Sequence, residues 1–208
     1  MNPVKQALFA FKQNWKESLY LGVAATIFTF FAQVVPFIGA FLISLGLLIF
    51  QELANLRLSS GVWKKDLSHL QNDWISFIIT AVILMPTGIL LGSAFGVLES
   101  PQSRFESWPM ALGLFILGVY FFLILSHGLI LQQERHQGIA RTLDVAALAS
   151  IKNFKTYLAA SFYIGIALVI GSLLKGVGFV IALPFLFYCD YFVFKVMKDK
   201  NAFDKKKE

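Results

Sequence analysis

Long apolar stretches alternate with short polar segments along the whole chain. Six such stretches can be drawn, at residues 18–35, 37–56, 74–98, 108–132, 157–174 and 176–197. Each is close to the roughly 20 residues that an α-helix needs to cross the ~30 Å hydrocarbon core of a bilayer. The run from Leu19 to Phe50 contains no charged side chain, which the core of a soluble domain does not require. The pattern therefore predicts an all-α integral membrane helical bundle that forms a single domain over residues 1–208.

The number of spans depends on two short interruptions. Only Pro36 separates the first two stretches and only Lys175 the last two, so each pair could instead form one long kinked helix. With six spans and a cytoplasmic N-terminus, all of the 18 Lys and Arg residues except Arg104 and Lys175 lie on the cytoplasmic side. Four spans would translocate Arg57, Lys64, Lys65, Arg135, Arg141, Lys152 and Lys155. Because Lys and Arg collect on cytoplasmic loops, we predict six transmembrane helices and two cytoplasmic termini.

Residues 3–16 and 139–155 are amphipathic, with apolar side chains at helical spacing and basic side chains on the other faces. The apolar faces comprise Val4, Leu8, Phe11 and Trp15 in the first segment and Leu143, Ala147, Ile151 and Phe154 in the second. Such a pattern beside a span is typical of a helix that lies in the membrane interface. The expected interfacial anchors are Lys12, Trp15, Lys16, Lys152, Phe154 and Lys155. The alternative, a connector that packs on other loops, is less favoured because each segment leads directly into a span.

Composition and charge narrow the classes of partner. The chain is 57% hydrophobic and 14% charged, against about 25% charged residues in soluble domains. The net charge of +6 could indicate nucleic-acid binding, but the basic residues are spread over several loops beside apolar stretches. We therefore expect anionic lipid headgroups as partners, together with a membrane protein or a second copy of the chain, and no nucleic acid. The single cysteine, Cys189, cannot form an internal disulfide or a zinc site alone.

An internal repeat relates the two ends of the chain. Residues 7–12 align with 147–152, and after a one-residue gap 14–16 align with 153–155. The same register aligns Gly39 with Gly178, so we expect tight turns at Pro36 and Gly39 and at Gly176 and Gly178. It also aligns Gln51 with Asp190. The units, at 3–56 and 139–197, flank the middle spans at 74–132 and so have the same orientation. The repeat is therefore parallel rather than inverted.

Short motifs near the C-terminus resemble those of a bacterial family. They are Asp144, Ala147 and Ser150 before Asn153, then Gly176-Val-Gly-Phe-Val-Ile-Ala-Leu-Pro184 and Tyr188-Cys-Asp-Tyr191. With the turn Pro36-Phe-Ile-Gly39, they resemble the YciC-like six-span proteins and the membrane domain fused to some glycerophosphodiester phosphodiesterases. The resemblance implies a protein of the bacterial cytoplasmic (inner) membrane and supplies no catalytic residues. Because no phosphodiesterase domain is evident in the sequence, we do not expect that activity.

Three ionisable residues lie inside the apolar stretches, where a charge is costly and is often functional. Glu52, His127 and Asp190 fall a turn or two from the cytoplasmic ends of the second, fourth and sixth spans. They could form a polar layer open to the cytoplasm that binds an ion, a lipid headgroup or a proton, or even a metal site. The favoured alternative is that they lie solvated among the headgroups or pair with Arg57 and Lys195.

No sequence motif specifies a reaction. Pro86 and Gly88 in the third span could mark a broken helix of the kind that lines transport sites, but a packed kink is the favoured interpretation. Phosphate-binding loops, metalloprotease motifs and nucleophile elbows do not occur, so we expect no cofactor and no enzymatic chemistry. The first function hypothesis is a structural, lipid-associated or accessory role. A small transporter or channel that uses the polar layer is the second, and a membrane-embedded lipid enzyme is the third.

Overall fold

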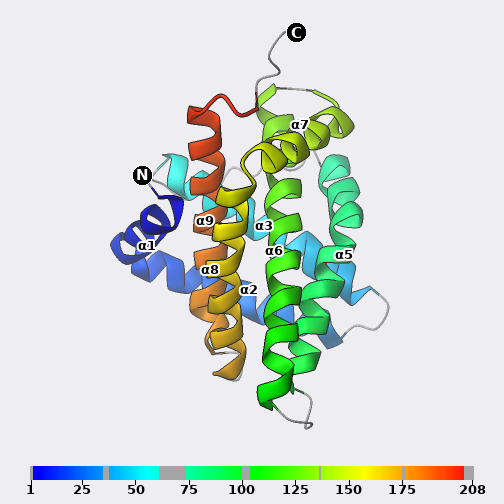
Figure 1. Cartoon of the computed structure of the whole chain (residues 1–208), viewed down its shortest axis with the longest axis vertical. Helices are drawn as coiled ribbons and strands as arrows, with labels where there is room; N and C mark the ends of the chain where they lie inside the picture. The colour runs from blue at the N-terminus through cyan, green and yellow to red at the C-terminus, as the bar shows by residue number, and fades with distance from the viewer. Residues whose placement is uncertain are drawn as a thin grey trace.

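The computed structural model describes residues 2–34, 38–60, 74–99, 104–135, 137–174 and 177–203. The helices in these ranges are α1 (Pro3–Gln13), α2 (Trp15–Val34), α3 (Gly39–Ser60), α5 (Trp74–Glu99), α6 (Arg104–Arg135), α7 (Ile139–Lys152), α8 (Phe154–Leu173) and α9 (Phe179–Asp199). No strand occurs in the described ranges (Figure 1). The prediction of an all-α bundle is confirmed.

Five described helical segments are long and apolar enough to cross a membrane. They are Gly39–Ser60, Ile78–Leu98, Ser107–Arg135, Phe154–Leu173 and Phe179–Asp199. Many of their apolar side chains face outward rather than into the bundle, as Ile83 and Ile181 do, which suits a surface in contact with lipid. The chain is therefore a membrane protein by the length and composition of its helices. Helix α2, the first predicted span, has 20 residues but is not one of the five.

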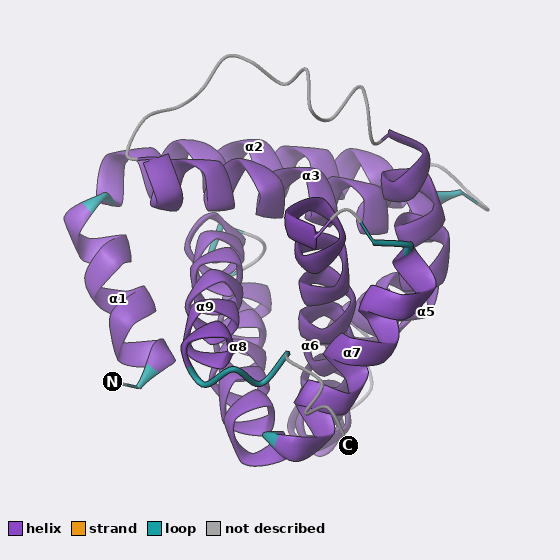
Figure 2. Cartoon of the chain, turned by 90° about the horizontal axis from the view of Figure 1, so that it is seen from above, coloured by secondary structure: helices purple, strands orange, loops and turns teal. Residues whose placement is uncertain are grey.

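The helices form two groups with different directions. Figures 1 and 2 show α5, α6, α8 and α9 running along the bundle, whereas the α2–α3 hairpin crosses its side. Helix α2 packs on α3 and α9, and α3 also packs on α5. At the crossing of α2 and α9, a Cβ on Gly22 would overlap the backbone carbonyl oxygen of Val180. Only glycine allows the two backbones to approach this closely.

Helix α5 continues without a break through Pro86, so the broken-helix alternative is wrong. The segment instead packs tightly on α3. A Cβ on Gly88 would lie 2.7 Å from the carbonyl oxygen of Ala40, and the Ser44 hydroxyl donates to the carbonyl oxygen of Leu84 at 3.2 Å. Pro86 and Gly88 thus belong to a close contact between helices.

Two of the four predicted turn residues lie within the residues that the structure describes. Pro36 and Gly176 lie outside the described residues. Gly39 begins α3. Gly178 lies where α9 packs against α8, and a Cβ there would be 2.5 Å from the Cα of Gly171. Glycine at this position therefore allows the α8–α9 hairpin to close tightly.

Helices α1 and α7 each end at an asparagine that bends the chain into the next helix. Asn14 has φ −113° and ψ 39°, and Asn153 has φ −114° and ψ 32°. The side-chain Nδ2 of each donates at 3.0 Å to the carbonyl oxygen four residues earlier, that of Ala10 or Ala149. The two bends that the repeat aligns therefore have the same local geometry, although α2–α3 lies across the bundle and α8–α9 along it (Figure 2).

Candidate functional site

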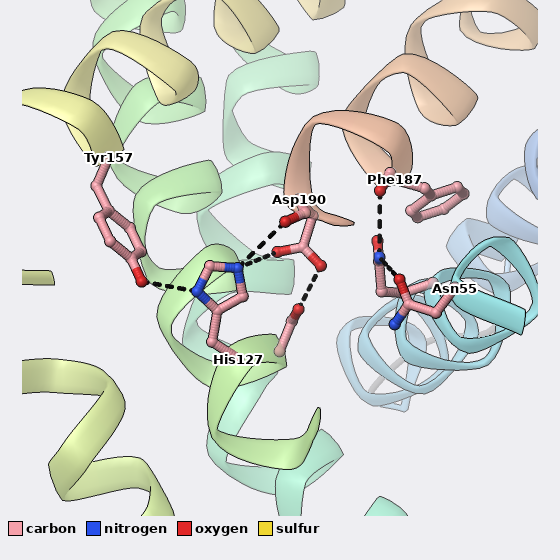
Figure 3. A network of polar contacts seen from close by, with 7 residues as sticks. Asn55, His127, Tyr157, Phe187 and Asp190 are labelled. Carbon is pink, nitrogen blue, oxygen red and sulfur yellow. Dashed lines mark hydrogen bonds and ion pairs between the residues drawn. The ribbon is translucent and has the colours of Figure 1, made fainter. Parts of the chain in front are cut away.

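A buried polar cluster joins α6, α8 and α9 (Figure 3). The imidazole Nε2 of His127 lies 3.2 Å from Oδ1 of Asp190 and 3.3 Å from the backbone oxygen of the same residue. Its Nδ1 lies 2.7 Å from the Tyr157 hydroxyl. The Ser126 hydroxyl donates to Asp190 Oδ2 at 2.6 Å. Two of the three ionisable residues singled out from the sequence are therefore direct partners.

The acceptors around His127 assign its ring hydrogen. The carboxylate and the backbone oxygen of Asp190 can only accept, so Nε2 carries the hydrogen and donates. In the neutral imidazole Nδ1 is then an acceptor, and the Tyr157 hydroxyl donates to it. The cluster therefore satisfies both ring nitrogens, which makes burial of this polar group tolerable.

Aromatic side chains enclose the cluster. The rings of Tyr157, Phe194 and Phe203 lie 5.4, 5.3 and 6.1 Å from the imidazole of His127. His127 and Asp190 are both 0% exposed. The prediction of residues solvated at headgroup level is therefore wrong for these two, and so is pairing of Asp190 with a lysine, because the imidazole of His127 lies 3.2 Å from its carboxylate.

Helix α3 contributes Gln51 to the same layer. Its Nε2 donates to Asn55 Oδ1 at 2.8 Å and to the backbone oxygen of Phe187 at 3.2 Å, one turn of α9 before Asp190. Glu52 is buried on α3, whereas the contacts of the His127 cluster given above come from α6, α8 and α9. The structure thus brings His127 and Asp190 together, with Gln51 nearby on the next helix of the layer.

The burial limits what the cluster can do chemically. His127 and Asp190 have no solvent-accessible surface, so neither contacts solvent in this structure. Within the part of the chain that the structure describes, no three His, Cys, Asp or Glu side chains could hold a metal ion together. The predicted metal option at Glu52, His127 and Asp190 is therefore wrong. The cluster connects α6, α8 and α9 by hydrogen bonds.

Sequence reasoning overlooked Tyr157 as a partner. The residue lies near the start of an apolar stretch, where tyrosine is usual at a membrane interface. Its hydroxyl nevertheless signals a need for a hydrogen-bond partner once the ring is buried, and the ring is 0% exposed. His127 supplies that partner from α6.

Helices α1 and α7 carry the second candidate site, their outward surfaces. The predicted apolar face of the first segment is split, because Val4 of α1 is buried against the bundle while Leu8 of α1 is 54% exposed and Trp15, the first residue of α2, is 53% exposed. The ammonium of Lys16 lies 5.7 Å from the Trp15 ring centroid. On and just after α7, the most exposed apolar side chain is Ile151, at 68%. Exposed apolar and basic side chains therefore share these surfaces.

The exposed positions of the second segment include Arg141, Leu148, Ile151, Lys152, Phe154 and Lys155. Such a mixture of apolar and basic side chains is typical of a helix that lies in the headgroup layer. Comparisons with models of protein families, with curated proteins and with solved structures gave no match. The geometry of the two sites is therefore the basis for any proposal about function.

Proposed function

We propose that this protein is a non-enzymatic component of the bacterial cytoplasmic membrane with a lipid-associated, structural or accessory role. It crosses the membrane six times, and α1 and α7 lie in the cytoplasmic headgroup layer. The observation that carries the proposal is the surface of α1 and α7, where exposed apolar side chains alternate with lysines. That surface matches an interface in which apolar groups enter the acyl region and lysines meet anionic phosphates.

The arrangement of the helices supports this orientation. Figure 1 draws α7 across one end of the bundle, the end at which α6 and α9 terminate. Basic residues that end these helices, such as Arg135 and Lys198, would then lie on the cytoplasmic side. In this proposal α2 is the sixth span and crosses obliquely. The motif resemblance to six-span bacterial proteins agrees with the same topology.

The role of the His127 cluster in this proposal is architectural. A hydrogen-bond network inside a membrane bundle fixes how helices pack. His127 and Asp190 draw α6 and α9 together, and Tyr157 adds α8. These helices form the support from which α7 and the first turn of α8 reach the interface. In this proposal the exposed surface of α1 and α7 contacts lipid or a partner, and the buried cluster only stabilises the bundle.

The depth of α1 and α7 in a bilayer tests the proposal. Nitroxide labels are attached to single cysteines at Phe9→Cys and Ile151→Cys in a Cys189→Ala background, with Arg141→Cys as a control at the start of α7. In vesicles containing phosphatidylglycerol, labels at 9 and 151 should collide with oxygen dissolved in lipid, and the label at 141 with a water-soluble nickel chelate. Equal access of the nickel chelate to all three labels would overturn the interfacial role.

Transport is the second candidate, favoured by one observation: an ionisable pair buried in a membrane bundle is often part of an ion or proton pathway. The test is proton flux in vesicles that contain a pH-sensitive dye. Flux that requires the protein and disappears in Asp190→Asn, while the variant remains folded, would support transport. Absence of flux above empty vesicles favours the architectural role.

A further inference from the structure

We propose that the bend between α7 and α8 binds one anionic phospholipid. Its phosphate lies between Lys152 and Lys155, and one acyl chain lies in a groove between α6 and α8. This inference rests on the proposed function, because it needs α7 in the headgroup layer. It adds a defined site and a ligand class to a surface that would otherwise attract lipid only in a general way.

The headgroup end of the site is a pocket of about 380 Å³ at the bend. Residues 151–156 line it, with Lys152 and Lys155 exposed on either side of Asn153. The pocket also lies at the amino end of α8, where the helix dipole favours an anion. Two ammonium groups and a helix amino end complement a phosphate diester.

The acyl end is an apolar groove of about 430 Å³ between α6 and α8. On α6 it is lined by Gly113, Ile116, Leu117 and Tyr120, which share one helical stripe. The seven-residue step from 113 to 120 makes this stripe about 10 Å long. A Cβ on Gly113 would meet no atom within 4 Å, so the groove has free space at that end.

The two cavities meet at one residue. Phe154 lines both the basic pocket and the apolar groove, and its ring packs against Tyr120 at 6.0 Å. Figure 1 shows α6 and α8 side by side below α7. A ligand that is anionic at one end and apolar at the other fits this succession of surfaces. Both volumes lie within the range typical of small-molecule sites, about 300–1,000 Å³.

The matching bend between α1 and α2 lacks this charge pattern. There Lys12 and Lys16 flank the asparagine, with Gln13 inserted before it, but Glu17 stands where the second bend has Thr156. Glu17 accepts from Arg57 at 3.3 Å, and Lys16 lies over Trp15. A second apolar groove of about 310 Å³, between α1, α8 and α9, has no basic residue in its lining. Charge complementarity therefore selects the α7–α8 bend for an anionic lipid.

Native mass spectrometry of the purified protein in detergent tests the site by titration with palmitoyl-oleoyl phosphatidylglycerol or the corresponding phosphatidylcholine. One phosphatidylglycerol should be retained, and phosphatidylcholine much more weakly. Lys152→Gln/Lys155→Gln should weaken phosphatidylglycerol binding about 30-fold, about fivefold for each lysine. The control Lys12→Gln/Lys16→Gln, at the other bend, should stay within about twofold. Equal losses in both pairs would overturn the site in favour of diffuse attraction.

A second pair of variants tests the groove. Gly113→Leu adds a side chain where the structure has open space, so it should keep the fold and reduce lipid retention at least about fivefold by filling the groove. Gly96→Leu on α5 is the control, because a Cβ there also meets no atom within 4 Å, and it should bind like the parent. Unchanged retention in Gly113→Leu would overturn the placement of the acyl chain.

The lipid-binding site and the proposed function can fail independently of each other. An interfacial nitroxide at position 151 together with full lipid retention in Lys152→Gln/Lys155→Gln would overturn the lipid site and leave the interfacial role standing. A water-exposed label at 151 would overturn both. Protection of Cys189, which is 0% exposed, from a thiol reagent shows in each variant that the bundle is folded.

Discussion

Replacing His127 by phenylalanine should destabilise the bundle, and a second substitution should rescue it. Phenylalanine keeps an aromatic ring among Tyr157, Phe194 and Phe203 but removes both ring nitrogens. Asp190 then keeps only the Ser126 hydroxyl as a donor among the contacts given above. The perturbation therefore isolates the polar part of the interaction from the packing.

The expected cost follows from burial. Asp190 is 0% exposed, and leaving a buried polar group without its hydrogen-bond partner costs about 1–3 kcal/mol, and more for a charged group. The Tyr157 hydroxyl also loses its 2.7 Å partner. Adding Asp190→Leu removes the carboxylate that has lost His127, and replacing both partners of a buried hydrogen bond by apolar groups can be nearly neutral. We expect a coupling energy of at least about 2 kcal/mol between the two positions.

The protein carries its own reporter for this experiment. Cys189 is the only cysteine in the chain and is 0% exposed, so a thiol-reactive dye should label it only when the bundle opens. In a heating ramp in detergent, His127→Phe should label on the order of 10 °C earlier than the parent. His127→Phe/Asp190→Leu should recover at least half of that shift. Circular dichroism over the same ramp checks that labelling follows loss of helix.

Two results would refute the reasoning. A shift below about 2 °C in His127→Phe would mean that the cluster contributes little to stability. Additive effects in the double variant would mean that His127 and Asp190 act independently, despite the 3.2 Å separation of Nε2 and Oδ1. Either result would remove the architectural role and raise the transport candidate.

Two further predictions use matched positions. Gly22→Ala should destabilise by about 1–3 kcal/mol through overpacking against the Val180 carbonyl, whereas Gly96→Ala should be neutral or stabilise by up to about 1 kcal/mol; the same labelling ramp measures both, and a harmless Gly22→Ala would contradict the close crossing. Lys198→Gln removes a 2.8 Å ion pair with Glu134, but both side chains are exposed, so stability should change by no more than about 0.5 kcal/mol. A loss of stability above about 1 kcal/mol in Lys198→Gln would contradict this estimate for an exposed ion pair.

Much of the fold could be predicted from composition along the chain. The stretches at 37–56 and 157–174 correspond to α3, Gly39–Ser60, and α8, Phe154–Leu173, because a helix that crosses lipid must be continuously apolar. The direction of the α2–α3 hairpin could not be predicted. It depends on the contact at Gly22, and a single glycine does not reveal which backbone it will meet.

The amphipathic helices show a limit of periodicity in membrane proteins. A helical repeat of apolar residues identifies the side that avoids water, but both lipid and protein provide such an environment. Val4 faces the bundle and Leu8 faces outward, although the two are four residues apart on one predicted face. The sequence therefore predicted that α1 is amphipathic but not how its apolar residues divide between protein and outer surface.

The candidate polar residues were identifiable because charges in apolar stretches are costly. Their pairing was not, since His127 and Asp190 lie 63 residues apart in the sequence and their contact depends on how α6 and α9 are placed along each other. Tyr157 was missed for the same reason. The repeat alignment of Gln51 with Asp190 did indicate a shared layer. Gln51 donates to the backbone of α9 at Phe187, one turn before Asp190 on the same helix.

The sidedness of α1, α7 and the end of α9 tests the central claim most directly. Single cysteines at Lys5→Cys, Arg141→Cys and Lys200→Cys, all exposed positions, are placed in a Cys189→Ala background. A membrane-impermeant maleimide is then applied to intact spheroplasts and to inverted vesicles. Six spans with α1 and α7 in one leaflet predict labelling of all three only in inverted vesicles. Labelling of Lys5→Cys in intact spheroplasts would mean that α2 does not cross the membrane. Helices α1 and α7 could then not lie in the same leaflet.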